Sequence, residues 1–468
     1  MESKFNPSIF REYDIRGIAE KDLSEDLARR LGWAFGKKVK QKFSNGHRPK
    51  VAVGRDCRHS GKQLAQALIQ GVIETGVDVI DIDVCPTPVT YFSVFNLELD
   101  GGIMVTGSHN PSDYNGFKIC LGKETLHGDE IQALRQDIEK GSPPEGDVGA
   151  VTSHSMIAAY IEHLVSNASK SLKPKKIVID AGNGTASTVA PLLFQKLGAE
   201  VVPLFCELDG NFPNHHPDPT EVSNLEDLIQ IVKKEKADFG VAFDGDSDRI
   251  GLVNENGEII FGDQIMILLS RQVLRQNPGA TIISEVKSSS RLYQDIEKHG
   301  GRALMWKTGH SLIKSKMKEE NAALAGEMSG HIFFADRYFG FDDAIYAAYR
   351  IYEILCETDK PLSQLLADVP PAFATPEIRV DCQENLKFDL VEATKKRLLK
   401  LNGKVIDLDG IRLEFEDGWG LLRASNTQPV LVLRFEATSF ERLSEIQAQF
   451  TEELKKAAQE IGHPPIES

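Results

Sequence analysis

The sequence predicts an α/β fold: three related α/β domains with mixed sheets, followed by a smaller C-terminal α+β domain. Its 468 residues correspond to roughly three or four domains at about 150 residues each. Short apolar runs alternate with amphipathic segments as far as residue 358, which is the pattern of successive strand–helix–strand units. After a proline-rich segment at 359–376, the pattern changes to strands around a tight turn and one long amphipathic segment.

The composition narrows the classes of partner. Hydrophobic residues make up 41% of the chain, and the net charge is −15. This charge argues against nucleic acid or an anionic membrane surface as the main partner. The N-terminus lacks the basic start and apolar core of a signal peptide, and no apolar run reaches membrane-spanning length. The six cysteines include no CxxC pair, which is typical of reduced thiols, so we expect a cytoplasmic protein.

The first α/β domain is predicted over residues 1–154. The alternation of strand and helix signals implies a parallel or mixed sheet. The expected helices are 23–37, 62–74 and 89–95, and the expected strands are 51–53, 77–84, 102–105 and 117–120.

The loop TGSHNP, residues 106–111, predicts a reactive serine beyond the strand at 102–105. Gly107 tolerates backbone angles that larger residues resist, and Asn110-Pro111 ends regular structure. Ligands of open α/β sheets bind beyond the carboxyl ends of strands, where Ser108 can be a nucleophile or carry a phosphoryl group. Lys118 follows across the loop and can fold back toward the serine. The alternative interpretation is an ordinary polar turn.

The second domain, predicted over 155–256, supplies a cluster of carboxylates. Asp244, Asp246 and Asp248 alternate directly after an apolar strand at 239–243. Three carboxylates this close repel one another unless a cation neutralises them, so we expect a hard divalent ion with oxygen ligands. The other expected elements are strands at 177–180 and 201–205, a helix ending near 197 and a helix at 223–236.

Two alternatives to this metal site stay open. The first is a solvated acidic turn, and the second is a phosphatase that uses Asp244 as its nucleophile. A calcium EF-hand is a poor match, because Arg249 occupies the loop position that needs glycine and strands flank the loop.

The third domain is predicted over 257–368 and the fourth over 369–468. Glu327, Ser329 and His331 alternate in a glycine-flanked loop of the third domain and can bind sugar hydroxyls. In the fourth, Arg423-Ala-Ser-Asn-Thr427 offers a guanidinium, an amide and hydroxyls that suit phosphate oxygens. For each of these two loops, the alternative interpretation is an ordinary polar loop. The expected elements are helices at 262–277 and 439–461, strands at 281–286, 303–306 and 430–435, a linker at 359–376 and strands at 404–415 around an Asp-Gly turn at 409–410.

Taken together, these motifs resemble the α-D-phosphohexomutase superfamily, specifically its bacterial phosphomannomutase/phosphoglucomutase branch. The resemblance covers essentially the full length in the same order and implies four domains around a central cleft. Met328 and the TGS lead into the serine loop favour hexose phosphates over the glucosamine branch. The motifs are FREYDIRG at 10–17, TGSHNP at 106–111, DGDSDR at 244–249, GEMSGH at 326–331 and RASNTQP at 423–429.

The resemblance also implies the roles of the site residues. The resemblance implies that Ser108 is the phosphoserine that donates and recovers the phosphoryl group. It also implies that the loop at 423–427 binds the phosphate that is not transferred. The implied catalytic residues are Ser108, Lys118, His310, Arg16, His109 and Arg249; the implied substrate-binding residues are Tyr13, Lys287, Glu327, Ser329, His331, Arg423, Ser425, Asn426 and Thr427; and the implied metal ligands are Ser108, Asp244, Asp246 and Asp248.

The family mechanism implies one Mg²⁺ per chain and a hexose 1,6-bisphosphate as intermediate and activator. A phosphoserine carries about −1.5 to −2 charge, and a phosphosugar adds a second dianion, so transfer between them needs Mg²⁺ and cationic side chains. Lys118 and His310 are the candidates for general base and acid at the sugar oxygen.

Closure by the last domain would exclude water. We expect phosphosugars as the only partners, with a monomer favoured and a dimer as the alternative. A metal-dependent aspartyl-phosphate phosphatase and a non-catalytic sugar-phosphate-binding protein remain the competing hypotheses.

Overall fold

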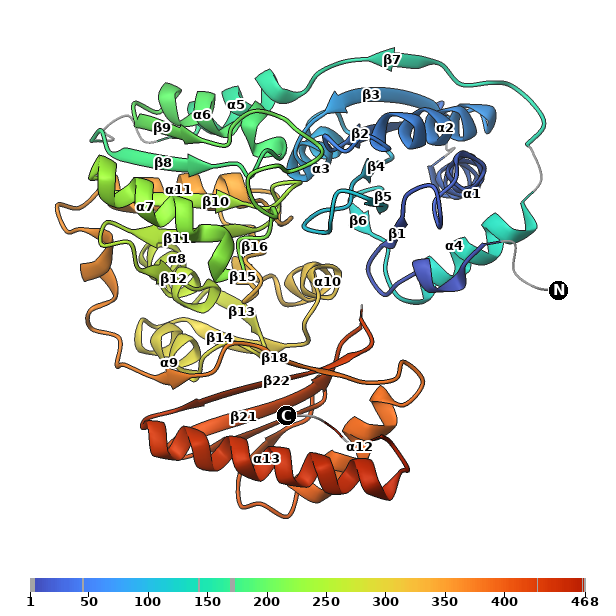
Figure 1. The fold of residues 1–468 in the computed structure, drawn as a ribbon. Helices are drawn as coiled ribbons and strands as arrows, with labels where there is room; N and C mark the ends of the chain where they lie inside the picture. The colour runs from blue at the N-terminus through green and yellow to red at the C-terminus, as the bar shows by residue number, and fades with distance from the viewer. Residues whose placement is uncertain are drawn as a thin grey trace.

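The computed structural model describes residues 5–43, 46–141, 144–168, 173–426, 428–464 and 466. Within them the strands form four sheets, and Figure 1 shows the four corresponding domains following one another from blue to red. The prediction of an α/β protein with mixed sheets and a smaller last domain is confirmed. No described helix combines the length and the apolar character that crossing a bilayer requires.

The first sheet has the order β1-β5-β4-β2-β3-β7, with β6 paired to β5. Strands β4, β2, β3 and β7 run parallel, whereas β5 is antiparallel to both β4 and β1. The sheet is therefore mixed, and β2 and β4 present their carboxyl ends at the same edge. The bounds are β1 Ile15–Ile18, β2 Lys50–Arg55, β3 Asp78–Val84, β4 Gly101–Val105, β5 Tyr114–Leu121, β6 Glu124–Thr125 and β7 Val151–Ser153.

The second and third sheets repeat this mixed arrangement with fewer strands. Their orders are β12-β11-β10-β8-β9 and β14-β13-β15-β16. In each, a parallel core ends in a reversal, from β10 to β11 and from β15 to β16. The bounds are β8 Lys176–Asp180, β9 Glu200–Leu204, β10 Phe239–Phe243, β11 Ile250–Asn254, β12 Ile259–Ile260, β13 Thr281–Glu285, β14 Arg302–Trp306, β15 Leu324–Gly326 and β16 Ile332–Phe334.

The fourth sheet is antiparallel in the order β17-β22-β21-β20-β19, with β18 also paired to β22. Figure 1 shows helix α13 lying along the outer face of this sheet, beside α12. The bounds are β17 Phe373–Ala374, β18 Ile378–Asp381, β19 Lys404–Ile406, β20 Ile411–Phe415, β21 Gly418–Ala424, β22 Val430–Ala437, α12 Lys387–Leu398 and α13 Phe440–Glu460.

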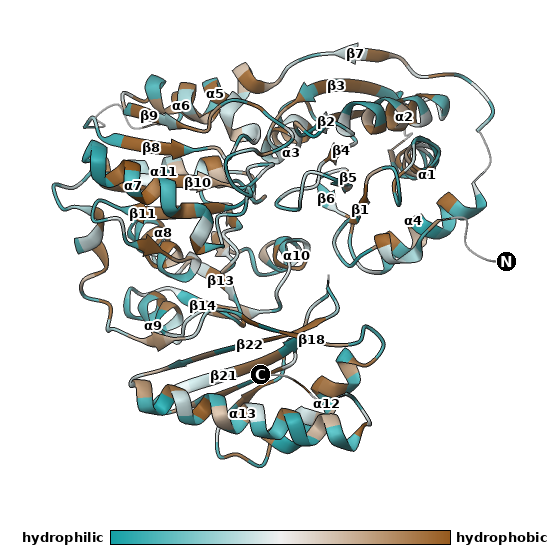
Figure 2. Cartoon of the chain, in the orientation of Figure 1, coloured by the Kyte–Doolittle hydropathy of each residue, from teal (hydrophilic) through white to brown (hydrophobic). Residues whose placement is uncertain are grey.

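The remaining helices cover the first three sheets. Figure 2 shows apolar residues concentrated on strands such as β3, β8 and β10, while outward helix faces such as those of α7 and α13 carry hydrophilic residues. The bounds are α1 Glu25–Phe43, α2 Gly61–Glu74, α3 Thr87–Asn96, α4 Asp129–Lys140, α5 Ile157–Ser166, α6 Ala190–Lys196, α7 Glu226–Glu235, α8 Gly262–Gln276, α9 Ser290–Lys298, α10 His310–Glu320 and α11 Ala344–Cys356.

Several element predictions need correction. The segment at 359–376 is not a plain linker, because it holds the 3-10 turn Leu362–Leu366 and strand β17. The helix expected at 223–236 starts as a 3-10 turn, and the one expected to end near 197 is preceded by another. The sequence analysis did not predict helices α4, α5, α9, α10, α11 and α12.

Two buried arginines attach the fourth domain to the third. Arg412 Nη1 donates to the carbonyls of Val286 and Ser288, each at 2.7 Å. Arg434 donates to the carbonyl of Lys287, which lies between them. The Arg412 guanidinium also lies 3.8 Å from the centre of the Trp419 ring. The loop that follows β13 is thus held from the fourth domain.

Candidate active site

Ser108 lies at the tip of the loop that follows β4, with a left-handed backbone φ of 49°. Its amide donates to Thr106 Oγ1 at 2.8 Å, and the residue is buried. At Gly107, a Cβ atom would lie 2.5 Å from the Arg58 guanidinium, so a larger residue does not fit without a shift. Packing against Arg58 therefore requires glycine at the position before the serine.

Asp56 and Arg58, which the sequence reading missed, hold the serine loop. Arg58 is fully buried and donates to the carbonyl of Ser108 at 2.8 Å and to that of Tyr114 at 3.1 Å. Asp56 Oδ2 accepts from the Gly107 amide at 3.0 Å and pairs with Arg58 at 3.1 Å. Both residues directly follow β2, the parallel neighbour of β4, so their position at a strand end could have indicated that they lie near the serine loop.

The second domain brings its aspartate loop directly onto the serine. The Ser108 hydroxyl donates to Asp244 Oδ2 at 2.8 Å. At Gly245 a Cβ atom would meet the Ser108 carbonyl at 2.6 Å, so glycine permits the close approach of the two loops. Asp244 Oδ1 accepts from the amides of Asp248 and Arg249 at 3.0 and 3.1 Å.

The three aspartates are buried together with one lysine. Lys118 Nζ, on β5, contacts Asp246 Oδ2 at 2.6 Å and also Asp248 Oδ2. Burial works to lower the pKa of Lys118, but the charges of Asp246, Asp248 and Asp244 outweigh it and raise that pKa. Burial and the other two carboxylates raise the pKa of Asp244 well above its usual range. One lysine therefore does not balance the three carboxylates.

This cluster fits a divalent cation. Ligand oxygens of Asp244, Asp246 and Asp248 all lie within 4.8 Å of one another. Asp246 Oδ1 and Asp248 Oδ1 are buried and have no hydrogen-bond partner among the described residues. Carboxylate oxygens are the ligands that Mg²⁺ prefers. The donor set, with its unpartnered oxygens, supports the predicted metal site.

Two histidines and an arginine border the cluster. His109 Nδ1 lies 3.2 Å from Ser108 Oγ, and burial, aided by the charges of Arg249 and Arg16, lowers the pKa of His109 well below its usual value. Arg249 Nε donates to His331 Nε2 at 3.0 Å. His331 therefore lies beside the aspartates, with its Nδ1 3.5 Å from Asp248 Oδ1.

Asp342, a third residue that the sequence analysis missed, connects the two histidines of the third domain. Its Oδ2 lies 3.2 Å from His331 Nδ1 and 3.5 Å from His310 Nδ1, and its Oδ1 lies 3.0 Å from Lys314 Nζ. The two imidazole rings stack with centres 5.4 Å apart. Burial and the charge of Lys314 keep the pKa of His310 well below its usual value.

A second group of predicted residues gathers between the first, third and fourth domains. Tyr13 donates to the Thr308 carbonyl and accepts from Asn426 Nδ2, both at 2.8 Å. Asp409 Oδ2 accepts from the Thr308 amide at 3.1 Å and from Arg423 Nε at 2.9 Å. The loop of the fourth domain therefore faces Tyr13 of the first.

The remaining predicted residues surround these two groups. Lys287 Nζ lies 3.1 Å from Glu377 and 3.5 Å from Glu285, and Glu327 Oε1 accepts from the Gly309 amide at 2.7 Å. Arg16 pairs with Asp14 at 2.5 Å. Ser425 Oγ accepts from the Gln428 amide at 3.2 Å, and Ser329 is half-buried. Thr427 lies outside the described residues.

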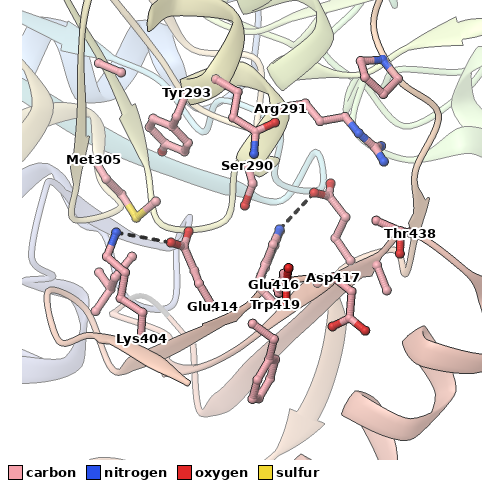
Figure 3. A pocket seen from close by; sticks show the side chains of 18 of the residues that line it. Ser290, Arg291, Tyr293, Met305, Lys404, Glu414, Glu416, Asp417, Trp419 and Thr438 are labelled. Carbon is pink, nitrogen blue, oxygen red and sulfur yellow. Dashed lines mark hydrogen bonds and ion pairs between the residues drawn. The ribbon is translucent and has the colours of Figure 1, made fainter. Parts of the chain in front are cut away.

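A well-defined cavity lies apart from these two groups of residues. It has a volume of about 510 Å³ and lies between α9 and β14 of the third domain and the sheet of the fourth, as Figure 3 shows. Its lining includes Tyr293, Met305, Glu414 and Trp419, and it contains none of the predicted site residues. The candidate active site is therefore defined by the side chains that meet around Ser108 and the three aspartates, and not by this cavity.

A serine, three aspartates and surrounding cations define a site for a divalent ion and anionic ligands, and comparison with known families agrees. Models of the phosphoglucomutase/phosphomannomutase α/β/α domains I, II and III match residues 7–145, 158–257 and 261–373. The model of the C-terminal domain matches 377–453. The chain belongs to the phosphoglucomutase/phosphomannomutase family.

Individual relatives are similar over almost the whole chain. The phosphomannomutase/phosphoglucomutase of Pseudomonas aeruginosa is 48% identical over 98% of this chain and 97% of that protein. The phosphoglucomutase of Neisseria gonorrhoeae is 46% identical over 94% and 95%. A solved structure of a phosphoglucomutase/phosphomannomutase family protein from Burkholderia thailandensis is 45% identical with a TM-score of 0.90 and covers 97% of this chain and 98% of that one.

Proposed function

We propose that the protein is a phosphohexomutase that interconverts hexose 1-phosphates and hexose 6-phosphates, with mannose, glucose or both as the sugar. The single observation that carries this proposal is the contact between the Ser108 hydroxyl and the buried aspartate cluster at 2.8 Å. It combines a phosphoryl-accepting oxygen with a divalent-metal site, and the names of the relatives agree with this function. The reaction would proceed through a phosphoserine and a hexose 1,6-bisphosphate.

Ser108 is the better nucleophile. Both carboxylate oxygens of Asp244 are already engaged, Oδ1 by two backbone amides and Oδ2 by the serine hydroxyl. A carboxylate held in this way is positioned to bind a cation and to orient the serine hydroxyl, not to attack phosphorus. This geometry favours the mutase over a phosphatase that forms an aspartyl phosphate.

The acid and base roles follow from the charges. In the first half-reaction the bond from phosphorus to Ser108 Oγ breaks, a bond from phosphorus to the sugar hydroxyl oxygen forms, and the hydroxyl proton leaves. Lys118 stays protonated because two carboxylates hold it, so it suits stabilisation of the developing charge, while its raised pKa makes it a weak proton donor. His310, whose pKa is lowered by burial and Lys314, is the unprotonated group that would take the hydroxyl proton, so its role differs from the predicted acid.

Mg²⁺ is the proposed cofactor, held by Asp244, Asp246, Asp248 and the phosphate on Ser108. When bound, it would neutralise charge on the transferring phosphoryl group. Asp246 and Asp248 each keep one buried oxygen without a partner for this purpose. The pairing of Lys118 with the other oxygens of the same residues provides part of the neutralisation that the cluster needs.

The second site would hold the rest of the sugar phosphate. Arg423, Ser425, Asn426 and Thr427 are proposed to bind the phosphate that is not reacting, and Glu327 and Ser329 the hydroxyls. Lys287, Tyr13, Arg16 and Arg249 would add contacts, with His109 beside the serine. Because the bisphosphate must turn over between two half-reactions, the same loops must accept both orientations.

The domain boundaries 1–154, 155–256, 257–368 and 369–468 are part of this proposal, with the phosphoserine, metal, sugar and phosphate loops assigned to them in that order. We further propose a cytoplasmic enzyme that acts as a monomer on free phosphosugars, with no nucleic acid or membrane partner.

The proposal is tested by incubating the protein with mannose 1-phosphate or glucose 1-phosphate, Mg²⁺ and a trace of glucose 1,6-bisphosphate. We expect conversion to the 6-phosphate of the same sugar. Release of inorganic phosphate in place of the 6-phosphate would support the phosphatase, and no change in either sugar would support a binding protein.

A further inference from the structure

We propose that Glu285 is a positioning residue for the sugar-binding part of the active site, an inference that rests on the proposed function. Glu285 is the last residue of β13, and its side chain is fully buried. Strand β13 lies between β14 and β15 and runs parallel to both. The carboxyl ends of these three strands therefore meet at one edge of the sheet, and the segments that follow them hold Lys287, His310 and Glu327.

The Glu285 carboxylate contacts all three of these segments. Its Oε2 accepts from Thr308 Oγ1 at 2.5 Å, and its Oε1 accepts from the Met328 amide at 3.1 Å. Its own loop contributes the Lys287 amide, 3.4 Å from Oε2, and Lys287 Nζ, 3.5 Å from Oε1. One carboxylate thus holds the backbone of three loops together.

Glu285 acts through these loops and not on the substrate, because no part of its side chain is exposed. Thr308 lies two positions before His310, and Met328 directly follows Glu327. A buried carboxylate is stable only where donors surround it, so a shift of any of these loops would leave charge unpaired. The contacts of Glu285 therefore fix the positions of the neighbouring residues that are proposed to bind the sugar and take its proton.

The first and second domains contain a similar arrangement. In each, a buried aspartate ends the middle strand of three parallel strands: Asp56 directly after β2 and Asp180 at the end of β8. Each accepts from the backbone amide two residues further along the chain, at 3.0 and 2.9 Å. Asp56 also accepts from a threonine hydroxyl and an amide of the neighbouring loop, which carries Ser108. Because Asp56 holds the serine loop in this way, the same set of contacts supports a positioning role for Glu285.

Glu285→Gln tests this role with little change in shape. Every partner of the carboxylate is a donor, so the amide, in either orientation, turns its own NH₂ group toward at least one backbone N–H. The loops then shift, and the sugar hydroxyls lose contacts. Thr308→Val, which removes only the hydroxyl donor, is a milder second variant.

The experiment measures how strongly the site recognises single hydroxyls. Calorimetry on the full-length Ser108→Ala protein with Mg²⁺, which cannot turn over, compares glucose 1-phosphate with analogues that each lack one ring hydroxyl. Loss of a recognised hydroxyl should weaken binding by more than about tenfold. Adding Glu285→Gln should reduce this factor to less than about threefold, and adding Thr308→Val should reduce it in part.

Glu353→Gln is the matched control. It makes the same change at another buried carboxylate of the third domain, on α11 and apart from the site, and should leave the hydroxyl factor unchanged. Circular dichroism and melting confirm that each variant folds, and Thr308→Val decides the matter if Glu285→Gln does not fold. Equal reduction in Glu353→Gln, an unchanged factor in the folded site variants, or a parent that binds every analogue as tightly as glucose 1-phosphate would overturn the inference.

Turnover of glucose 1-phosphate by the protein with Ser108 intact tests the proposed function separately. Turnover combined with unchanged hydroxyl factors in the Glu285→Gln and Thr308→Val proteins refutes only the positioning role. Reduced factors without turnover refute only the mutase, and a parent that binds no sugar phosphate overturns both.

Discussion

The Ser108 hydroxyl donates a 2.8 Å hydrogen bond to the Asp244 carboxylate, although the two residues are 136 positions apart and belong to different sheets. Gly245 permits this contact by keeping its own backbone close to the serine carbonyl. The contact joins the proposed phosphoryl carrier to the proposed metal site.

We predict that the phosphoenzyme is a phosphoserine at Ser108. The protein labelled with radioactive hexose bisphosphate is denatured and treated with acid or hydroxylamine. A serine ester survives both treatments, whereas an acyl phosphate on Asp244 is cleaved by hydroxylamine. Ser108→Ala should abolish labelling, and a hydroxylamine-labile label would support the phosphatase instead.

Asp246→Asn should lower kcat by roughly ten- to a hundredfold while changing the affinity for the sugar phosphate little. The substitution removes one anionic metal ligand and one partner of Lys118, so the loss, about 1.5–3 kcal/mol, falls on the transition state. The measurement is steady-state kinetics across a range of Mg²⁺ concentrations. Asp227→Asn, the same charge change on the exposed face of α7, is the control. Near-normal turnover of Asp246→Asn at limiting Mg²⁺ would show that the cluster does not hold a metal that the reaction needs.

Arg423→Lys should lower kcat/KM by roughly ten- to a hundredfold in both directions and for both sugars. Asp409 holds Arg423 at Nε, so the rest of the planar guanidinium can bind two phosphate oxygens, which an ammonium group cannot reproduce. More bisphosphate should also escape, because the intermediate must be held while it turns.

This assay uses both 1-phosphates and both 6-phosphates and measures released bisphosphate. A defect confined to one sugar epimer would place Arg423 at the hydroxyls and refute its assignment to the phosphate.

Arg58→Lys should slow phosphorylation of Ser108 and destabilise the first domain. The substitution removes most of the hydrogen bonds that the guanidinium donates to the serine loop. It also leaves the buried Asp56 carboxylate poorly paired, and breaking a buried ion pair costs about 3–5 kcal/mol of folding free energy. Urea unfolding and the rate of labelling measure the two effects.

Arg48→Lys is the matched control for Arg58→Lys. Arg48 also donates to two backbone carbonyls, those of Gly76 and Val148, but it is exposed and remote from the loop. Its substitution should change stability by less than about 0.5 kcal/mol and leave labelling unchanged. Equal effects of the two substitutions would contradict the role of Arg58.

The pair His215–Asp180 should make stability depend on pH. Burial works to lower the pKa of His215, but the 3.1 Å contact with Asp180 outweighs it and raises that pKa. Stability from the pair is therefore fully present below the unfolded value of about 6.5 and is lost as pH rises through the folded value. His215→Gln should thus cost more free energy of unfolding at low pH than at high pH.

His163→Gln provides a control of opposite sign. Burial lowers the pKa of His163, so its neutral form is favoured in the fold and stability falls as pH drops. The free-energy cost of His163→Gln should grow with rising pH, where that of His215→Gln shrinks. Parallel pH trends for the two variants would refute the assignment of the residue whose trend is reversed.

The loops of the site were predictable because each follows an apolar strand. Runs such as Gly101–Val105 and Phe239–Phe243 are buried along their whole length, so the polar residues after them must lie at a sheet edge. The aspartate cluster was predictable for an electrostatic reason, since three alternating carboxylates need a cation. Neither inference requires knowledge of distant contacts.

Asp342 and Arg58 are site residues whose contacts no local sequence pattern identifies. Asp342 lies in a short segment between β16 and α11, with no repeat or spacing that connects it to His310 or His331. Arg58 is an ordinary charged residue in the sequence, yet it is fully buried because its guanidinium replaces solvent around the carbonyls of the serine loop.

The sequence by itself determined the class of fold, the strand ends, the serine loop, the carboxylate cluster and the resemblance to a family, because these depend on local periodicity and residue chemistry. Only the tertiary structure decided which loops meet. Packing of separate sheets brings Ser108 to Asp244, Lys118 between Asp246 and Asp248, and His331 beside Asp248. Such contacts depend on how whole domains bury their shared surfaces, and no short segment of the chain records that geometry.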